Sequence, residues 1–257
     1  MIRVVKIGGN VIDDSEALKR FLKDFAEMES PKILVHGGGK EASRLCVALG
    51  IEPRMVGGRR VTDRDTLDVV TMVYAGLINK RIVSLLQSYG CDAVGLSGAD
   101  GNVIRASMRA KEPVDYGYVG DIDPSLINAG FIETLLKEEG LTPVFCAINH
   151  DGKGTLLNCN ADSVATAVAI ACSSFSPVAL TFCFEKEGVL ADVDDPSSVI
   201  AAIDSSGYSA LKERGAISGG MIPKVENALD AVAKGVESVT IKSSSKLSSR
   251  SGTLITR

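Results

Sequence analysis

Short runs of apolar, β-branched residues alternate with amphipathic segments along most of the chain. The apolar runs predict strands over Ile2–Ile7, Ile33–Val35, Ala93–Leu96, Thr142–Ile148, Val178–Phe184, Ser238–Lys242 and Gly252–Thr256. The amphipathic segments predict helices over Ser15–Met28, Lys40–Leu49, Asn79–Tyr89, Ala161–Ala171 and Pro223–Lys234, and a further helix capped by Thr62 or Asp63. This alternation indicates an α/β fold in which helices cover both faces of a parallel sheet. The stretch from Gly98 to Gly120 interrupts the pattern and predicts a β-hairpin excursion, and Ser243–Ser251 predicts a surface loop.

Composition and charge exclude several classes of protein. Of the 257 residues, 45% are hydrophobic and 23% are charged, which is too apolar for a disordered chain. The net charge of −4 disfavours a protein that coats nucleic acid, because such surfaces carry a basic surplus. We find no apolar stretch of about 18 residues, and the chain enters its first strand without a signal peptide, so we expect no membrane segment.

The six cysteines and two histidines do not indicate a disulfide framework or a metal site. No CxxC pair occurs, and most cysteines lie in apolar runs, which is typical of buried, reduced thiols in a cytosolic protein. His36 and His150 lie far apart in the sequence and lack the spacing of metal ligands. We therefore expect a cytoplasmic protein without a metal of its own.

Two glycine clusters each follow a predicted strand. Gly8 and Gly9 follow the first strand, and Gly37–Gly39 follows the second. Glycine at this place lets backbone N–H groups approach an anion, and a following helix N-terminus adds partial positive charge. Because ligands of open α/β sheets bind outside the carboxyl ends of the strands, the two loops suggest one phosphate site. The alternative is that the glycines only make tight turns.

Four charged side chains are candidates for binding or catalysis. Lys6 ends an apolar strand, where a charge is costly without a partner. The guanidinium of Arg60, in a loop before a predicted helix, suits bidentate binding of a carboxylate. Asp162 and Lys224 lie at the starts of two predicted helices, although Asp162 could serve only as a helix cap and Lys224 only as a solvated lysine. No GxxxxGK[ST] or GxGxxG motif occurs, which excludes a P-loop protein and disfavours a nicotinamide oxidoreductase.

Five segments, taken together and in order, resemble the acetylglutamate kinases of the amino acid kinase family. The segments are Val5–Gly9, Val35–Gly39, Gly58–Thr62, Leu157–Asp162 and Gly219–Lys224. The resemblance implies a three-layer αβα sandwich around a mostly parallel sheet, with residues 1–176 binding an acylated amino acid and forming a dimer, and residues 177–257 binding ATP. It also implies ATP-dependent phosphorylation of the γ-carboxylate of N-acetyl-L-glutamate in arginine biosynthesis, with Mg²⁺ arriving on the nucleotide.

The same resemblance implies roles for single residues. Lys6 and Lys224 would stabilise charge on the transferring phosphoryl group, and Asp162 would orient both lysines. The residues that would bind phosphoryl oxygens through backbone N–H groups are Gly8, Gly9 and Gly38. The residues that would hold the substrate are Gly38, Gly39, Arg60 and Asn158. The residues that would border the nucleotide are Glu185, Gly188, Val189, Leu190, Ile217 and Ser218.

Three departures from the family pattern bear on ligands and assembly. Lys186 replaces an apolar residue in the nucleotide-side loop, so the adenine and ribose contacts stay open. Arg59 replaces the leucine that is commoner in relatives. Either it points to solvent, or it pairs with an additional carboxylate, in which case the acyl group is succinyl rather than acetyl. The chain lacks the extra N-terminal helix of arginine-inhibited members, from which we expect a homodimer without arginine feedback.

Two other interpretations stay open. The chain could be a related glutamate, aspartate, carbamate or uridylate kinase, although Arg60 and Asn158 favour the acylglutamate type. A non-enzymatic nucleotide-binding relative is disfavoured, because Lys6, Asp162 and Lys224 are all retained. In each case we expect small-molecule partners, with neither nucleic acid nor membrane among them.

Overall fold

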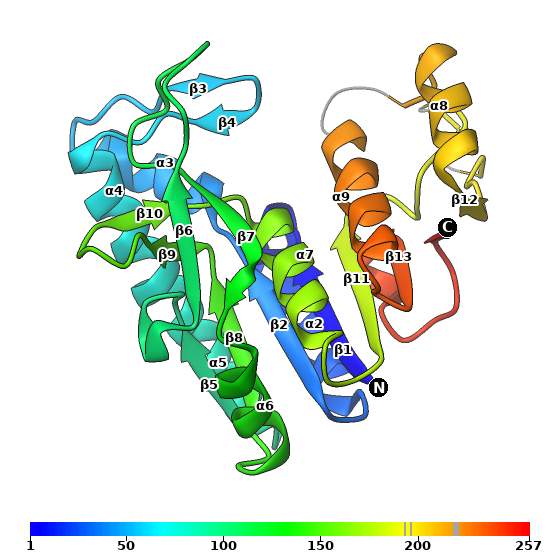
Figure 1. Ribbon diagram of the computed structural model, residues 1–257, viewed down its shortest axis with the longest axis horizontal. Helices are drawn as coiled ribbons and strands as arrows, with labels where there is room; N and C mark the ends of the chain where they lie inside the picture. The colour runs from blue at the N-terminus through cyan, green and yellow to red at the C-terminus, as the bar shows by residue number, and fades with distance from the viewer. Residues whose placement is uncertain (193, 196, 218–220) are drawn as a thin grey trace.

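A mostly parallel sheet of eight strands runs through the molecule (Figure 1). The structure, a computed structural model, describes residues 1–192, 194–195, 197–217 and 221–257. The strand order is β12-β14-β13-β11-β1-β2-β8-β5, and β14 runs antiparallel to β13 while the strands from β13 to β5 are parallel. These strands are β1 (Ile2–Ile7), β2 (Lys32–His36), β5 (Ala93–Leu96), β8 (Thr142–Cys146), β11 (Val178–Phe184), β12 (Ala202–Ile203), β13 (Ser238–Ser243) and β14 (Thr253–Ile255). The predicted α/β fold with a mostly parallel sheet is confirmed.

Two groups of helices cover the sheet. In one group α7 packs against α6, α9 and the central strands; in the other α2 packs against α5, and α3 against α4. The helices are α1 (Gly9–Asp13), α2 (Ser15–Glu27), α3 (Gly39–Ala48), α4 (Arg64–Thr71), α5 (Asn79–Ser88), α6 (Ala129–Lys137), α7 (Ala161–Cys172), α8 (Ser205–Glu213) and α9 (Met221–Ala233). The side chains of Asp14, Asp63 and Asn160 accept hydrogen bonds from first-turn N–H groups and so begin α2, α4 and α7.

A single long helix forms where two separate helices were predicted. A π-helical segment, η1 (Met72–Ile78), joins α4 to α5, so that the helix runs over Arg64–Ser88. By length and composition alone this helix could cross a membrane, a test that the core helix of a soluble protein also passes. Our count of uninterrupted apolar runs did not single out this helix, and passing this test is only weak evidence for a membrane span. In the fold, Val70, Val73 and Ile82 of this helix are buried in the core.

The excursion after β5 is larger than the predicted hairpin. Its strands β6 (Ile104–Met108) and β7 (Gly120–Ile127) are antiparallel, so the second strand begins where the prediction ended. Two further strands, β9 (Ile148–His150) and β10 (Leu156–Asn158), complete a four-stranded sheet. A separate small hairpin pairs β3 (Met55–Val56) with β4 (Arg59–Arg60). Short 3₁₀ turns, η2 (Asp100–Asn102) and η3 (Ser244–Lys246), lie in the connecting loops.

The main sheet is continuous across the predicted boundary near residue 176. Strand β1 pairs with β11 in parallel register from Ile2 opposite Val178 to Ile7 opposite Cys183. The carboxyl ends of β1, β2 and β11 therefore meet at one edge of the sheet, which is where ligands of open α/β sheets bind. All six cysteines are buried and unpaired.

Candidate active site

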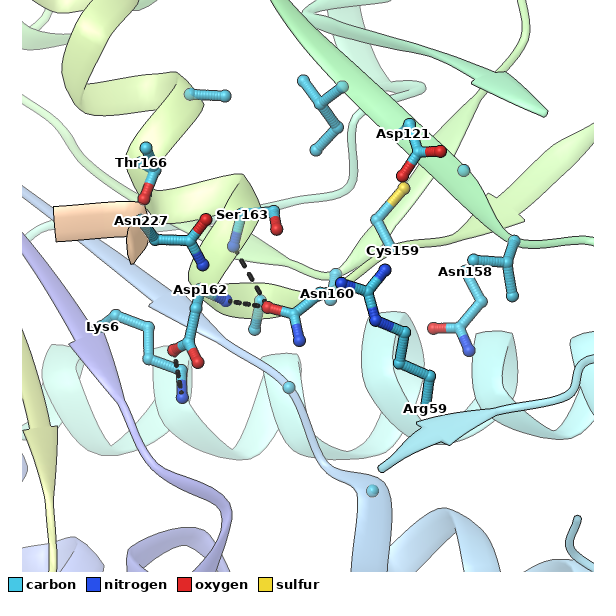
Figure 2. A pocket seen from close by; sticks show the side chains of 18 of the residues that line it. Lys6, Arg59, Asp121, Asn158, Cys159, Asn160, Asp162, Ser163, Thr166 and Asn227 are labelled. Atoms are coloured by element: carbon cyan, nitrogen blue, oxygen red, sulfur yellow. Dashed lines mark hydrogen bonds and ion pairs between the residues drawn. The ribbon is translucent and has the colours of Figure 1, made fainter. Parts of the chain in front are cut away.

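A cavity of about 410 Å³ opens at the carboxyl ends of β1 and β2. Its wall combines the end of β1, the glycine loops, the β3–β4 hairpin, strand β7, the loop before α7, and parts of α7 and α9. Segments from distant parts of the sequence therefore meet around one space, whose side chains Figure 2 shows. The predicted site residues that line it are Lys6, Gly9, Gly38, Gly39, Arg59, Arg60, Asn158 and Asp162.

One carboxylate of the cavity wall bridges two lysines, of which Lys6 lines the cavity and Lys224 does not. Lys6 Nζ lies 2.7 Å from Asp162 Oδ1, and Lys224 Nζ lies 2.8 Å from Asp162 Oδ2. Lys6 comes from β1, Asp162 from the first turn of α7 and Lys224 from the first turn of α9. The side chain of Asp162 is only 12% exposed, and those of Lys6 and Lys224 are 10% and 21% exposed. The fold thus brings together all three residues that the resemblance assigned to catalysis.

The charge balance of this cluster favours an anionic ligand. Burial by itself would raise the pKa of Asp162, but the two ammonium groups outweigh burial and lower that pKa to about 2. The carboxylate is therefore ionised at pH 7, and two positive charges share one negative charge. The surplus positive charge, held in a partly buried place, suits a phosphate group.

The glycine loops approach the cavity without side chains. A Cβ on Gly8 would lie 3.0 Å from the carbonyl oxygen of Cys183, so β11 leaves no room for one. Gly38 has φ 154°, and a Cβ there would collide with Ile78 and crowd Tyr74 of η1. Gly9, at the N-terminus of α1, has open space beside it. Close packing thus requires glycine at two of these positions, and Gly9 and Gly38 line the cavity whereas Gly8 does not.

Arg60 is buried and held from one side only. Its Nη2 donates to the carbonyl oxygen of Gly39 and to Ser43 Oγ, both at 2.7 Å. Its Nη1 is buried without a partner among the described residues. A buried guanidinium nitrogen without an acceptor is costly, so this atom fits an incoming carboxylate.

Asn158 and Asn160 flank the end of β10. Asn158 Nδ2 donates to Thr62 Oγ1 at 3.0 Å, which ties β10 to the loop after Arg60. Asn160 caps α7 by accepting from the N–H groups of Asp162 and Ser163 at 2.8 and 3.1 Å. The cap fixes the first turn of α7 and hence the place of the Asp162 carboxylate.

Arg59 points into the cavity, toward the loop that carries Asn158 and Asn160 (Figure 2). It is an exposed residue, and none of the described carboxylates forms an ion pair with it. At the same end of the cavity Arg109 forms a bidentate ion pair with Asp121 across β6 and β7. Arg59 is therefore a cation that the described part of the chain leaves available.

Several residues of the cavity wall were missed from the sequence. They are Tyr74, Arg109, Asp121, Thr166, Asn227, Asp230 and Lys234. Thr166 and Asn227 could have been found, because they follow Asp162 and Lys224 by four and three residues on helices and so share their faces. Arg109 and Asp121 required the register of the excursion, which the sequence pattern did not give.

The predicted nucleotide residues do not line this cavity. Gly188, Val189 and Leu190 follow β11, where a Cβ on Gly188 would lie 2.8 Å from Thr253 Oγ1, and Val189 donates to that oxygen. The side chains of Val189, Leu190 and Ile217 are buried, so these residues could offer a nucleotide only backbone groups. Glu185 is exposed beside them. Ser218 lies outside the described residues.

Comparison with known proteins agrees with this architecture. The model of the amino acid kinase family matches residues 1–243. The chain belongs to the amino acid kinase family. An acetylglutamate kinase of Cytophaga hutchinsonii is 51% identical over 240 residues, covering 93% of this chain and 89% of its own. One of Phocaeicola vulgatus is 48% identical over 254 residues, covering 99% of this chain and 98% of its own.

A solved structure shares the fold of this amino acid kinase. It is that of smu.665 from Streptococcus mutans, with a TM-score of 0.83 and 31% identity, covering 99% of this chain and 98% of the other. The sheet and its helices are thus those of a known amino acid kinase architecture. Family membership also makes ATP the expected phosphoryl donor for the cavity described above.

Proposed function

We propose that this amino acid kinase transfers the γ-phosphoryl group of ATP to the γ-carboxylate of N-acetyl-L-glutamate, a step of arginine biosynthesis. The observation that carries the proposal is the bridge of Asp162 between Lys6 and Lys224 beside two glycine loops. The acetylglutamate kinases that are 48% and 51% identical to this chain support the choice of substrate over those of glutamate, aspartate, carbamate and uridylate kinases.

The chemistry needs no general base. The attacking carboxylate is ionised at pH 7, since an ordinary glutamate carboxyl has a pKa near 4.3. One of its oxygens attacks the γ-phosphorus in line, and the bond from phosphorus to the β,γ-bridging oxygen breaks, leaving ADP. The enzyme must align the two oxygens and neutralise the charge on the three equatorial ones. Lys6, Lys224 and the loop amides of Gly8, Gly9 and Gly38 supply those donors.

The substrate is oriented at the other end of the cavity. Arg60 Nη1 binds the α-carboxylate, which does not react. Asn158 and the backbone of Gly39 contact the neighbouring polar groups of the substrate. This fixes the side chain of the acylglutamate so that its γ-carboxylate reaches toward Lys6.

Mg²⁺ accompanies ATP in this proposal. The described residues contain no group of three or more His, Cys, Asp or Glu side chains that could hold a metal ion. Asp162, the carboxylate nearest the phosphate site, is already engaged by two lysines. The ion would therefore be held by the phosphates of the nucleotide, where it would neutralise part of their charge.

We assign residues 1–176 to the acylated amino acid and residues 177–257 to the nucleotide, within a cytoplasmic homodimer. Large apolar side chains are exposed on α3 and η1, namely Val47, Met72 and Leu77. Such side chains on two adjoining helices suit a second copy of the chain. Sedimentation of the wild-type protein should give twice the mass of one chain. The double variant with Leu77→Asp and Met72→Asp should sediment as a monomer, with the mass of one chain.

The function is tested by ADP release coupled to trapping of the product. With MgATP and N-acetyl-L-glutamate, we expect ADP to form in step with an acyl phosphate that hydroxylamine converts to a hydroxamate. Free glutamate, aspartate, carbamate and UMP serve as competing substrates. Faster release of ADP with any of them, or release that does not depend on the acylglutamate, would contradict the proposal.

A second candidate is the same reaction on N-succinyl-L-glutamate. It is favoured by Arg59, which lines the cavity and has no ion-pair partner among the described residues. The terminal carboxylate of a succinyl group would pair with this guanidinium. Parallel kinetics with the two acylglutamates decide between the candidates, and a clear preference for the acetyl compound removes the second.

A further inference from the structure

A buried polar chain lies directly behind the second glycine loop. The ring of His36, at the end of β2, has Nδ1 2.8 Å from the carbonyl oxygen of Gly37 and Nε2 3.0 Å from Asn79 Nδ2. Asn79, the first residue of α5, also donates through Nδ2 to the carbonyl oxygen of Val144 at 2.9 Å. Its Oδ1 accepts from Lys80 Nζ at 3.2 Å. His36 and Asn79 are both buried, and neither lines the cavity.

The partners determine which atoms of this chain donate. A carbonyl oxygen such as that of Val144 can only accept, and Lys80 Nζ can only donate, so the amide of Asn79 is oriented from both sides. The second hydrogen of Asn79 Nδ2 then faces His36 Nε2, which must accept it. The ring proton of His36 therefore lies on Nδ1 and is donated to the carbonyl oxygen of Gly37. Burial lowers the pKa of His36 to about 4, which keeps this neutral form at pH 7.

The carbonyl group held in this way sets the direction of the next amide. In a planar trans peptide, the C=O of Gly37 and the N–H of Gly38 point in opposite directions. That N–H has no backbone acceptor among the described residues, and Gly38 lines the cavity. A glycine loop has no side chains to anchor it, so its amides need such a support from outside the cavity.

We propose that His36 and Asn79 are positioning residues, which hold the Gly37 carbonyl so that the Gly38 amide points at the phosphoryl group. The inference rests on the proposed function, because that function places a phosphoryl group beside Gly38. The helix that carries Asn79 also contacts the loop, since Ile78 packs where a Cβ of Gly38 would lie. The His36 ring and this helix therefore both restrict the loop.

The first test observes the ring of His36 without any substrate. The chain has two histidines, so histidine labelled with ¹⁵N gives two ring systems, and a His150→Gln variant assigns them. We expect His36 to carry its proton on Nδ1 and to remain neutral from pH 5.5 to pH 8.5. A ring protonated on Nε2, or one that titrates near pH 6.5, would overturn the proposal. Because this readout is independent of turnover, it stands even if the wild-type protein does not phosphorylate N-acetyl-L-glutamate.

The second test changes the donor to the ring. The carboxylate of an Asn79→Asp variant cannot donate to Nε2 and instead accepts a proton from it, so Nε2 becomes protonated and the ring no longer holds the neutral form with its proton on Nδ1. We expect kcat to fall at least tenfold with less than a threefold change in either KM, together with the shift of the ring proton. Lys80→Met, at an exposed helix position, keeps the test usable if the first variant does not fold, and should lower kcat two- to fivefold.

A matched control separates positioning from stability. Thr142→Val removes another buried hydrogen bond, from Cys91 Sγ, at the opposite end of β8. We expect its kcat to stay within twofold of the wild type. Unchanged kcat in both Asn79→Asp and Lys80→Met, or an equal loss of kcat in Thr142→Val, would show that His36 and Asn79 contribute only to stability.

Discussion

The positive side chains at the two ends of the cavity differ in whether they have ion-pair partners. At the phosphate end, Lys6 and Lys224 are both paired with Asp162 at 2.7 and 2.8 Å. At the substrate end, Arg60 Nη1 is buried with no partner among the described residues, and Arg59 forms no ion pair with a described carboxylate. Positive groups that stabilise a short-lived transition state must be oriented before the reaction begins. A positive group that binds a stable carboxylate can instead gain its ion-pair partner when the substrate binds.

This difference predicts how variants at each end should behave. A group that acts only on the transferring phosphoryl group should affect kcat, and a group that binds a carboxylate which does not react should affect KM. The following substitutions, at five residues of the cavity and its lysine pair, test the two ends from the largest expected effect to the smallest.

Replacing either lysine of the phosphate end should cause the largest loss. Lys6→Met and Lys224→Met should each lower kcat by about 10²–10³, or about 2.7–4 kcal/mol of barrier, as expected for the loss of one donor to a developing anion. The KM for the acylglutamate should change little. Lys19→Met, which removes an exposed lysine paired with Glu16, is the control and should leave kcat unchanged. A rise in KM at unchanged kcat would place these lysines in ground-state binding instead.

Removing the shared carboxylate should reduce stability in a pH-dependent way. The pKa of Asp162 is lowered from 3.8 to about 2 in the folded protein, so its ionised form stabilises the fold above about pH 4. This contribution is lost as the pH falls from about 4 toward 2. Asp162→Asn should therefore lower the free energy of unfolding by about 2–3 kcal/mol at pH 7. The difference in this free energy between the wild type and the variant should be smaller at pH 3.

Urea denaturation of the wild type and of Asp162→Asn at pH 7, 4 and 3 measures this difference in the free energy of unfolding. Glu139→Gln, at an exposed position, controls for the loss of one negative charge. A difference between Asp162→Asn and the wild type that is the same at pH 7 and pH 3 would mean that the two lysines do not stabilise the ionised carboxylate.

Shortening the donor at the substrate end should mainly weaken binding. Arg60→Lys keeps the charge but loses the forked geometry, so the KM for the acylglutamate should rise about tenfold, or about 1.4 kcal/mol, with kcat changed less than threefold. Arg54→Lys, an exposed arginine near the same hairpin, is the matched control. A fall in kcat at unchanged KM would show that Arg60 acts on the reacting group.

The smallest effect is expected at Arg59. If a succinyl carboxylate binds there, Arg59→Leu should lower kcat/KM for N-succinyl-L-glutamate about fivefold, or about 1 kcal/mol, because the pair is partly exposed. Kinetics with N-acetyl-L-glutamate should stay within twofold. Equal effects on the two substrates would show that Arg59 does not recognise the acyl group.

Much of the fold followed from local pattern, because apolar periodicity distinguishes buried strands from amphipathic helices. The long helix did not follow, because the π-helical segment η1 joins two helices that separate periodic patterns had suggested. For the cavity, the segments around Lys6, Arg60 and Asp162 were recognisable, since each carries a short motif. The pair of Arg109 and Asp121 was not, because it depends on the register between β6 and β7.

The support behind the glycine loop was equally hidden. His36 and Asn79 are 43 residues apart and lie in ordinary strand and helix patterns. Their contact arises only when β2 and α5 pack on the same part of the sheet. Sequence patterns locate the groups that face a ligand more readily than the groups that hold them in place.

The central claim is that Lys6 and Lys224 converge on one phosphoryl group while Asp162 holds both. A crystal structure with MgADP, aluminium fluoride and N-acetyl-L-glutamate tests it most directly, since the fluoride complex stands in for the transferring group. We predict both Nζ atoms within about 3 Å of its fluorine atoms, with Asp162 still between the two lysines. Density for the fluoride complex that contacts neither lysine, or only one of them, would contradict the account.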